Sequence, residues 1–228
     1  MSTHFAIVSM GRTGSTLLVG LLNSHPDIEC KGELFGPHAA YTKFPALTRK
    51  EFLERHAYDS KLPIKGFKMP FDWILNHPGI FDDFRDLGYK IVRLKRTNGL
   101  AHLVSVRLAQ RNNNWGSREP YGIERTKVDK AALYRFLQYR DSSEAMLDRV
   151  TALLTGKTFN YETILDCNEQ QRLLSFLGAR PHALKPDTIK QRKLPLTDTI
   201  ENLTELRQAL SGTPWARHIE EWVNEAMS

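Results

Sequence analysis

The sequence predicts an α/β protein of three layers, in which a central parallel sheet is flanked by helices. The first observation is an apolar run at residues 4–9 that ends in a glycine loop and is followed by leucines at helical spacing. The second is that two later apolar runs, residues 63–69 and 89–94, each precede a segment with helical periodicity. The third is the length of 228 residues with 41% hydrophobic residues, which suits one domain over residues 1–228.

Strands are expected where short apolar runs are bounded by loop residues, at 4–9, 63–69, 89–94 and 157–161. Helices are expected where apolar residues recur every three or four positions, at 15–24, 128–154 and 168–177, and from 199 onward. Gly156 and Gly178 follow two of these helices, a position that favours glycine. Residues 112–127 are rich in Asn, Gly, Arg and Ser without periodicity, which predicts a long surface loop.

The charge balance narrows the classes of partner. Lys and Arg total 32 against 26 Asp and Glu, a net charge of +6 that favours anionic ligands. Acidic residues interleave with the basic ones along the chain, whereas a nucleic-acid-binding protein usually concentrates its cations in a run or on one helix. A small, phosphate-rich ligand is therefore expected, and no nucleic acid.

Cysteine usage and hydropathy predict the compartment. Cys30 and Cys167 are too few for a disulfide framework and lack the paired spacing of a zinc site. The most apolar stretch, residues 17–22, is far shorter than a membrane span, and residues 1–10 do not have the pattern of a signal peptide. A cytoplasmic protein without a membrane span is expected.

The loop at residues 9–16 has the composition of an anion site. It lies between a predicted strand and a predicted helix, where backbone N–H groups and the positive end of the helix dipole converge. Gly11 and Gly14 allow the backbone to approach a phosphate, Arg12 adds a full positive charge, and Ser15 and Thr16 add hydroxyl donors. Strand, loop and helix together predict a P-loop-like fold.

The same loop differs from that of the nucleoside-triphosphate hydrolases. Their loop ends in Gly-Lys-Ser/Thr, whereas this one ends in Gly14-Ser15-Thr16 without a lysine. The run at residues 91–94 also lacks a terminal acidic residue to hold magnesium. ATP hydrolysis is therefore disfavoured, although an atypical small-molecule kinase stays open as an alternative.

Three motifs in order give the sequence a resemblance to a known family. Residues 12–18, Arg-Thr-Gly-Ser-Thr-Leu-Leu, resemble the 5′-phosphosulfate loop of sulfotransferases that use 3′-phosphoadenosine 5′-phosphosulfate (PAPS), with Thr13 as a mild departure. Residues 96–105 are similar to their 3′-phosphate motif, and residues 160–165 to a Tyr-Glu-Asp-Leu segment, with Thr163 in place of Asp. The likeness is to the bacterial carbohydrate and nodulation-factor branch and extends to about residue 216.

The resemblance implies that PAPS is the co-substrate, and no metal is expected, because sulfuryl transfer requires none in principle. It also implies a set of residues that hold PAPS: Arg12, Thr13, Gly14, Ser15, Thr16, Arg96, Ser105, Tyr161 and Lys190. Arg12 would neutralise the 5′-phosphate, Arg96 and Ser105 would bind the ribose 3′-phosphate, and Tyr161 would touch the adenine. Lys190, with Arg192 and Lys193, would close over the phosphates.

Sulfuryl transfer also needs a base that accepts the proton of the attacking hydroxyl. Glu33 is the preferred candidate, because the related enzymes carry a Gly-Glu at this place and the segment follows the first helix. Glu29, His25 and His38 remain alternatives. Arg12 and Glu33 are thus the expected catalytic residues.

The acceptor is expected to contact Glu33 and a few side chains near the carboxyl edge of the sheet: His38, Lys68 and Trp115. The other tryptophans, Trp73, Trp215 and Trp222, are expected to be packing residues. The predicted function is transfer of a sulfuryl group to a hydroxyl of a carbohydrate, glycolipid or small metabolite. A non-catalytic nucleotide-binding module stays open as a third possibility, and the sequence specifies neither the acceptor nor the oligomeric state.

Overall fold

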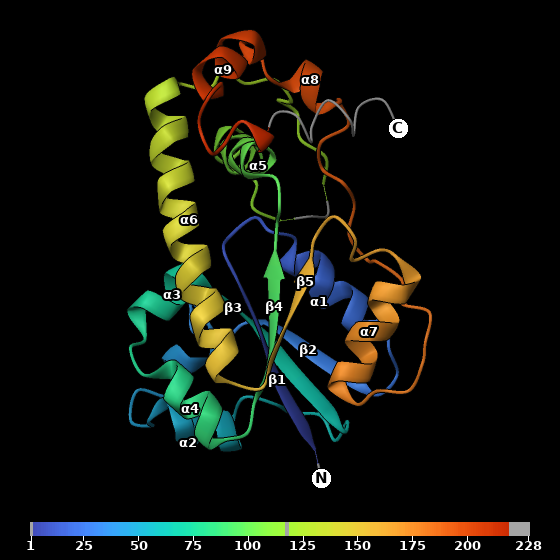
Figure 1. Ribbon diagram of the computed structural model, residues 1–228. Coiled ribbons are helices and arrows are strands. Elements are labelled where there is room, and N and C mark those ends of the chain that lie inside the picture. The colour runs from blue at the N-terminus through green and yellow to red at the C-terminus, as the bar shows by residue number, and fades with distance from the viewer. Residues whose placement is uncertain (1, 117–118, 219–228) are drawn as a thin grey trace. The chain divides into compact units, whose positions relative to one another are not determined.

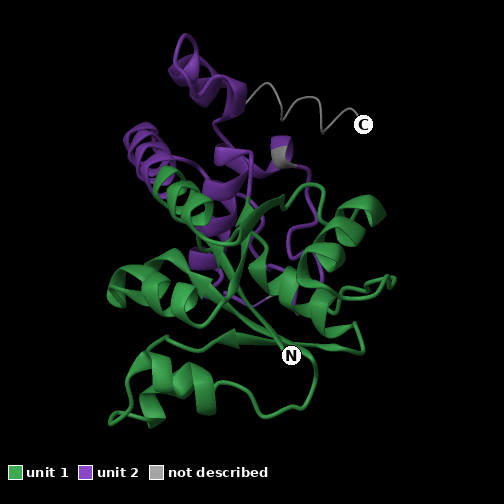
Figure 2. Cartoon of the chain, turned by 60° about the horizontal axis from the view of Figure 1, so that its bottom comes forward, with its two compact units in different colours: residues 1–95, 144–187 green, residues 96–143, 188–228 purple. Residues whose placement is uncertain are grey.

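The structure is a computed structural model that describes residues 2–116 and 119–218. It divides into two compact units (Figure 2): unit 1 comprises Met1–Lys95 and Glu144–Asp187, and unit 2 comprises Arg96–Ser143 and Thr188–Ser228. Each unit has its own apolar core. The single domain expected from the sequence stays a prediction.

Unit 1 contains the predicted parallel sheet. Within the described residues it has five strands in the order β2-β3-β1-β4-β5, all parallel (Figure 1). Their bounds are β1 Thr3–Ser9, β2 Ile28–Glu33, β3 Ile64–Pro70, β4 Lys90–Lys95 and β5 Gly156–Asn160. The four strands predicted from apolar runs are confirmed, and β2, at the edge of the sheet, is an additional strand that the sequence analysis missed.

Both faces of this sheet are buried, which explains the continuous apolar run of β1. Phe5 and Ile7 point into a core formed with α1 (Ser15–Asn23) and α7 (Cys167–Leu177). Ala6 and Val8 point to the opposite face. This face is covered by the short helices α2 (Arg49–Arg55), α3 (Phe71–Asn76) and α4 (Ile80–Asp86) and by the end of the long helix α6 (Lys130–Leu153). Parallel strands buried on both faces are expected to be apolar throughout. A 3₁₀ turn, η1 (Ala40–Lys43), follows β2.

The predicted helix at 168–177 is present as α7, and the residues at its two ends explain where it begins and where it stops. Asp166 accepts hydrogen bonds from the backbone N–H groups of Asn168 and Glu169, a typical N-cap. Gly178 ends the helix with φ of 82°, a left-handed conformation that favours glycine. The helices predicted at 15–24 and 128–154 are likewise confirmed as α1 and α6.

Unit 2 is mostly helical. It contains α5 (Gly99–Arg111), residues 130–143 of α6, α8 (Leu196–Thr199) and α9 (Leu203–Leu210). Side chains of α5, α6 and α9 form its leucine-rich core. The described part of the 112–127 segment is a loop, as predicted, tied to residues 199–202 by a parallel bridge between Thr126 and Ile200. The expected helical tail continues into 219–228, which lies outside the described residues. No helix among the described residues is long and apolar enough to cross a membrane.

Candidate active site

The glycine loop joins the central strand β1 to α1, as the sequence predicted. Gly14 is the N-cap of α1 with φ of 90°, and Arg12 has φ of 62°, so the loop contains two left-handed residues. The Thr13 hydroxyl donates to the carbonyl of Met10 over 2.8 Å and is fully buried, which fixes the turn from within. In the described structure α1 has no side-chain cap and no acidic residue in its first turn. Its N-terminal N–H groups, including those of Ser15 and Thr16, are therefore suited to an anion.

Tyr161 lies against this loop. It follows β5, and its backbone N–H donates to the carbonyl of Lys95 over 2.7 Å. A Cβ atom placed on Gly14 would lie 2.2 Å from Cδ2 of the Tyr161 ring. Only glycine fits here, because any side chain would meet the ring and would also strain a backbone with φ of 90°.

Gly14→Ala is expected to lower the free energy of unfolding by about 2–4 kcal/mol, from left-handed strain and displacement of the Tyr161 ring. Chemical denaturation measures the change. Gly11→Ala is the matched control, since a Cβ there meets nothing within 4 Å and its φ is not positive, so a loss below about 0.5 kcal/mol is expected. Equal losses in the two variants would contradict the assigned contact.

A chain of polar contacts links Glu33 to the glycine loop. The Lys68 amino group lies 3.0 Å from Oε1 of Glu33 and donates to the Thr16 hydroxyl over 3.2 Å. The Lys68 side chain is 17% exposed and that of Glu33 is 34% exposed, so the ion pair is partly desolvated while the carboxylate stays accessible. The expected base and the expected anion loop are thus joined through one cation.

A β-bulge sets this arrangement. Along β2 the pairing with β3 is regular from Ile28 to Lys31, which lies opposite Phe67, and then shifts so that Glu33 lies opposite Lys68. Without the extra residue, Gly32 would lie opposite Lys68 and Glu33 one position further along β3. Bulges often re-aim a side chain beside an active site.

Trp73 contacts the other oxygen of Glu33. Its indole N–H donates to Oε2 over 2.6 Å. Trp73 is half-buried and packs against the core of its face, so the packing role expected for it is present together with a polar contact that the sequence analysis did not foresee. In the sequence, the feature that could have indicated this contact is that Trp73 comes only five residues after Lys68.

The alternative bases are engaged elsewhere or remain exposed. Glu29 lies near the start of β2 and accepts from the Ser60 hydroxyl over 2.7 Å. His25 is buried, with one ring nitrogen 3.1 Å from the carbonyl of Arg180 and the other accepting from the backbone N–H of Asp27. His38 is exposed in the segment between β2 and η1.

The remaining predicted site residues belong to unit 2. Arg96 is half-buried, and its carbonyl accepts from the buried guanidinium of Arg140 over 2.6 Å. Ser105 is half-buried on α5, Lys190 is exposed, and Trp115 is 53% exposed. Trp222, expected to be a packing residue, lies outside the described residues.

The start of α5, just after Arg96, is held by His218. Its Nδ1 accepts from the backbone N–H of Gly99 over 3.2 Å, and its carbonyl accepts from the Asn98 side chain over 3.0 Å. Burial, helped by Arg140 and Arg217, lowers the pKa of His218 to about 4, so at neutral pH the ring is uncharged and can accept. Asn98 also caps α5 by accepting from Ala101.

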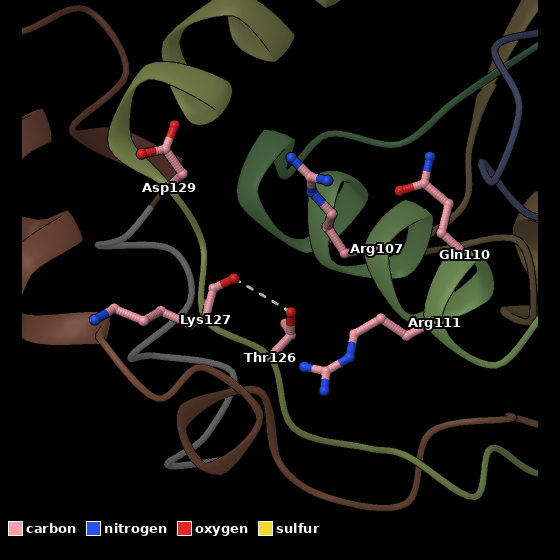
Figure 3. Close-up of a pocket in the computed structure, with 6 residues that line it drawn as sticks. All are labelled: Arg107, Gln110, Arg111, Thr126, Lys127 and Asp129. Atoms are coloured by element: carbon pink, nitrogen blue, oxygen red, sulfur yellow. Dashed lines mark hydrogen bonds between the residues drawn. The ribbon is translucent and has the colours of Figure 1, made fainter.

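Unit 2 also contains an open hollow of about 470 Å³. Figure 3 shows that one wall comes from α5 and the other from the segment before α6, with the Lys127 amino group directed away from the hollow. The residues that line it are Arg107, Gln110, Arg111, Thr126, Lys127 and Asp129. The Arg111 guanidinium donates to the carbonyl of Arg125. The hollow contains none of the residues predicted from the sequence.

Comparison with solved structures supports the fold. A sulfotransferase from Alicyclobacillus acidocaldarius superposes with a TM-score of 0.54 at 15% identity, covering 98% of this chain and 96% of that one. Mouse sulfotransferase SULT7A1, solved in complex with PAP, gives 0.51 at 13% identity, covering 98% and 89%. At these identities the likeness establishes the P-loop-like three-layer fold.

Comparison of sequences shows which proteins the chain is similar to. Nodulation protein H of Rhizobium meliloti is 28% identical over 244 residues, covering 95% of this chain and 94% of its own length. The Rhizobium tropici protein of the same name is also 28% identical, covering 95% and 92%. The sulfotransferase family model matches residues 5–104, a span that contains the glycine loop, Glu33, Lys68 and Arg96. The chain is thus similar to the sulfotransferase family over residues 5–104 and to nodulation protein H over 95% of its length.

Proposed function

We propose that the protein is a sulfotransferase that moves the sulfuryl group of PAPS to a hydroxyl of a carbohydrate, glycolipid or small-metabolite acceptor. The observation that carries the proposal is the contact chain from Glu33 through Lys68 to Thr16. It joins a carboxylate that can accept a proton to a loop that can hold a phosphosulfate, and a cation lies between them.

The glycine loop would bind the 5′-phosphosulfate. The N–H groups at the start of α1, the hydroxyls of Ser15 and Thr16 and the charge of Arg12 are the donors proposed for it. The Thr13 hydroxyl is used within the loop, so its contribution would come from the backbone N–H.

In the proposed reaction the acceptor hydroxyl oxygen attacks sulfur and its proton passes to Glu33. The bond between sulfur and the bridging phosphate oxygen breaks, and adenosine 3′,5′-bisphosphate leaves with the negative charge. Lys68 and Arg12 would stabilise the charge that develops during transfer, which is usually the largest contribution in such sites. This route uses side-chain cations and includes no metal ion.

The rest of the nucleotide would be held by the other predicted residues. Arg96 and Ser105 are proposed for the 3′-phosphate, Tyr161 for the adenine and Lys190 for closure over the phosphates. The support for Arg96 is that Arg140 and the cap of α5 fix the backbone on which it stands.

The acceptor would contact Glu33, Lys68, His38 and Trp115. A tryptophan that is 53% exposed in a loop suits stacking on a sugar ring. We place the protein in the cytoplasm, for which the two free cysteines, Cys30 and Cys167, are the support.

Thermal unfolding with adenosine 3′,5′-bisphosphate tests the co-substrate. At about 100 times Kd the ligand should stabilise the wild type by about 2.7 kcal/mol, a rise in Tm of about 5–10 °C. Arg96→Ala should lose most of this rise, because it removes the charge proposed for the 3′-phosphate.

Arg107→Ala is the matched control, since Arg107 lies on α5 outside the proposed site, and it should keep the full rise in Tm. A rise with ATP and magnesium alone would instead support a kinase. No rise with either nucleotide would contradict the proposal. A positive result leads directly to a screen of hydroxyl acceptors with labelled PAPS.

A further inference from the structure

We propose that Trp73 is a positioning residue that fixes the orientation of the Glu33 carboxylate for proton transfer. This inference rests on the proposed function, because it assigns Trp73 a role through the candidate base. Trp73 contributes no charge and would not itself exchange a proton.

The two oxygens of Glu33 are held by two different donors. Lys68 lies 3.0 Å from Oε1, and the Trp73 indole N–H donates to Oε2 over 2.6 Å. A glutamate side chain has three rotatable bonds, and its terminal torsion is broad, so one contact would leave the carboxylate free to turn. Two contacts, one on each oxygen, define the plane of the group.

The chemistry of the second donor suits a base. An indole N–H donates only, so it stabilises the carboxylate without competing for the proton. Each carboxylate oxygen has two lone pairs, so both oxygens keep one for an incoming hydroxyl. The 34% exposure of the Glu33 side chain leaves room for this approach.

The indole is itself held in place. Trp73 packs against the aromatic core that covers this face of the sheet. A Cβ placed on Gly36 would lie 3.4 Å from Cε2 of the indole and 3.5 Å from Oε2 of Glu33, so ring and carboxylate both border the same stretch of backbone. The donor is therefore positioned by packing before any substrate binds.

Both donors to Glu33 come from one continuous segment of the chain. Lys68 is near the end of β3 and Trp73 is in α3, which begins at Phe71 directly after that strand. One short segment thus supplies both donors, and the bulge in β2 brings Glu33 to it.

The contact between Trp73 and Glu33 can be tested without an activity assay, by NMR of the indole N–H groups in ¹⁵N-labelled full-length protein. The resonance missing from Trp73→Phe identifies Trp73 among the four tryptophans. Glu33→Gln should move this resonance upfield, because a neutral amide is a weaker acceptor than a carboxylate. Trp215, which donates to Asp141 over 2.7 Å, is the matched indole–carboxylate control and should not move. An unchanged Trp73 resonance would overturn the proposal.

Kinetics test the role. Trp73→Phe keeps an aromatic ring but removes the donor that holds Oε2 of Glu33. The value of kcat should fall about 5–20-fold while the KM for PAPS stays unchanged, because the variant misplaces the carboxylate and leaves the glycine loop intact. Trp215→Phe should keep the wild-type kcat, and a Trp73→Phe variant with wild-type kcat would contradict the positioning role.

A double-mutant cycle separates this inference from the proposed function. If Trp73 acts through Glu33, adding Trp73→Phe to Glu33→Gln should change kcat by less than about 2-fold. Additive losses would overturn the positioning role while leaving Glu33 as the base. A Glu33→Gln variant with wild-type kcat would instead contradict the proposed base, whatever Trp73 does.

Discussion

Glu33→Gln is expected to lower kcat by about 10²–10⁴-fold, the range that a positioned general base contributes. The amide has the shape of the carboxylate but cannot accept the proton of the attacking hydroxyl. Binding of adenosine 3′,5′-bisphosphate should be unchanged, because the contacts of the described residues link Glu33 to the glycine loop through Lys68. Initial rates with labelled PAPS and thermal shifts with the bisphosphate measure the two quantities.

Glu29→Gln is the matched control on the same strand. Glu29 is four residues from Glu33, about 13 Å along an extended strand, and is hydrogen-bonded to Ser60. This variant should keep kcat within about 2-fold. Loss of activity in Glu29→Gln with retention in Glu33→Gln would move the base to the other end of β2.

Lys68→Met is expected to lower kcat by about 10²–10³-fold, the effect of removing one donor from a site that stabilises developing charge. Methionine keeps much of the length of the side chain, so the loss would report the charge that lies between Glu33 and Thr16. The KM for PAPS should also rise, because Thr16 belongs to the loop proposed to bind the phosphosulfate. Steady-state kinetics over PAPS concentration separate the two effects.

Lys65→Met is the control for charge on β3. Lys65 is half-buried near the start of that strand, opposite Glu29 in the β2 pairing. The Lys65→Met variant should keep the wild-type kcat and the wild-type KM for PAPS. A Lys68→Met variant with wild-type kcat would show that the ion pair with Glu33 is structural only.

The parts of the fold that follow from local pattern could be predicted from the sequence. The apolar run at 4–9, the glycine loop and the leucines of α1 are contiguous, and each favours a single conformation. Strand β2 was missed because an edge strand carries charged residues and a glycine, although Ile28 and Cys30 alternate with Glu29 and Lys31 in a period of two.

The details of the candidate site depend on packing that the sequence does not express. The residues in contact with Glu33 are 35 and 40 positions away, and which residue faces Lys68 is decided by a one-residue bulge. A pattern of alternation specifies which side chains are buried, but an inserted residue shifts the partner of each residue after it. Glu33 could therefore be chosen by resemblance, whereas its contact with Trp73 required coordinates.

The order of strands determines which of the proposed site residues lie next to a strand that can open locally. The glycine loop follows β1, which has a hydrogen-bonded neighbour on each side, whereas Glu33 ends β2, which has one. Central strands open only with the whole fold, while edge strands can open locally at lower free energy. The sheet therefore places the proposed nucleotide-binding loop after a strand that opens only with the whole fold, and the proposed base at the end of a strand that can open locally.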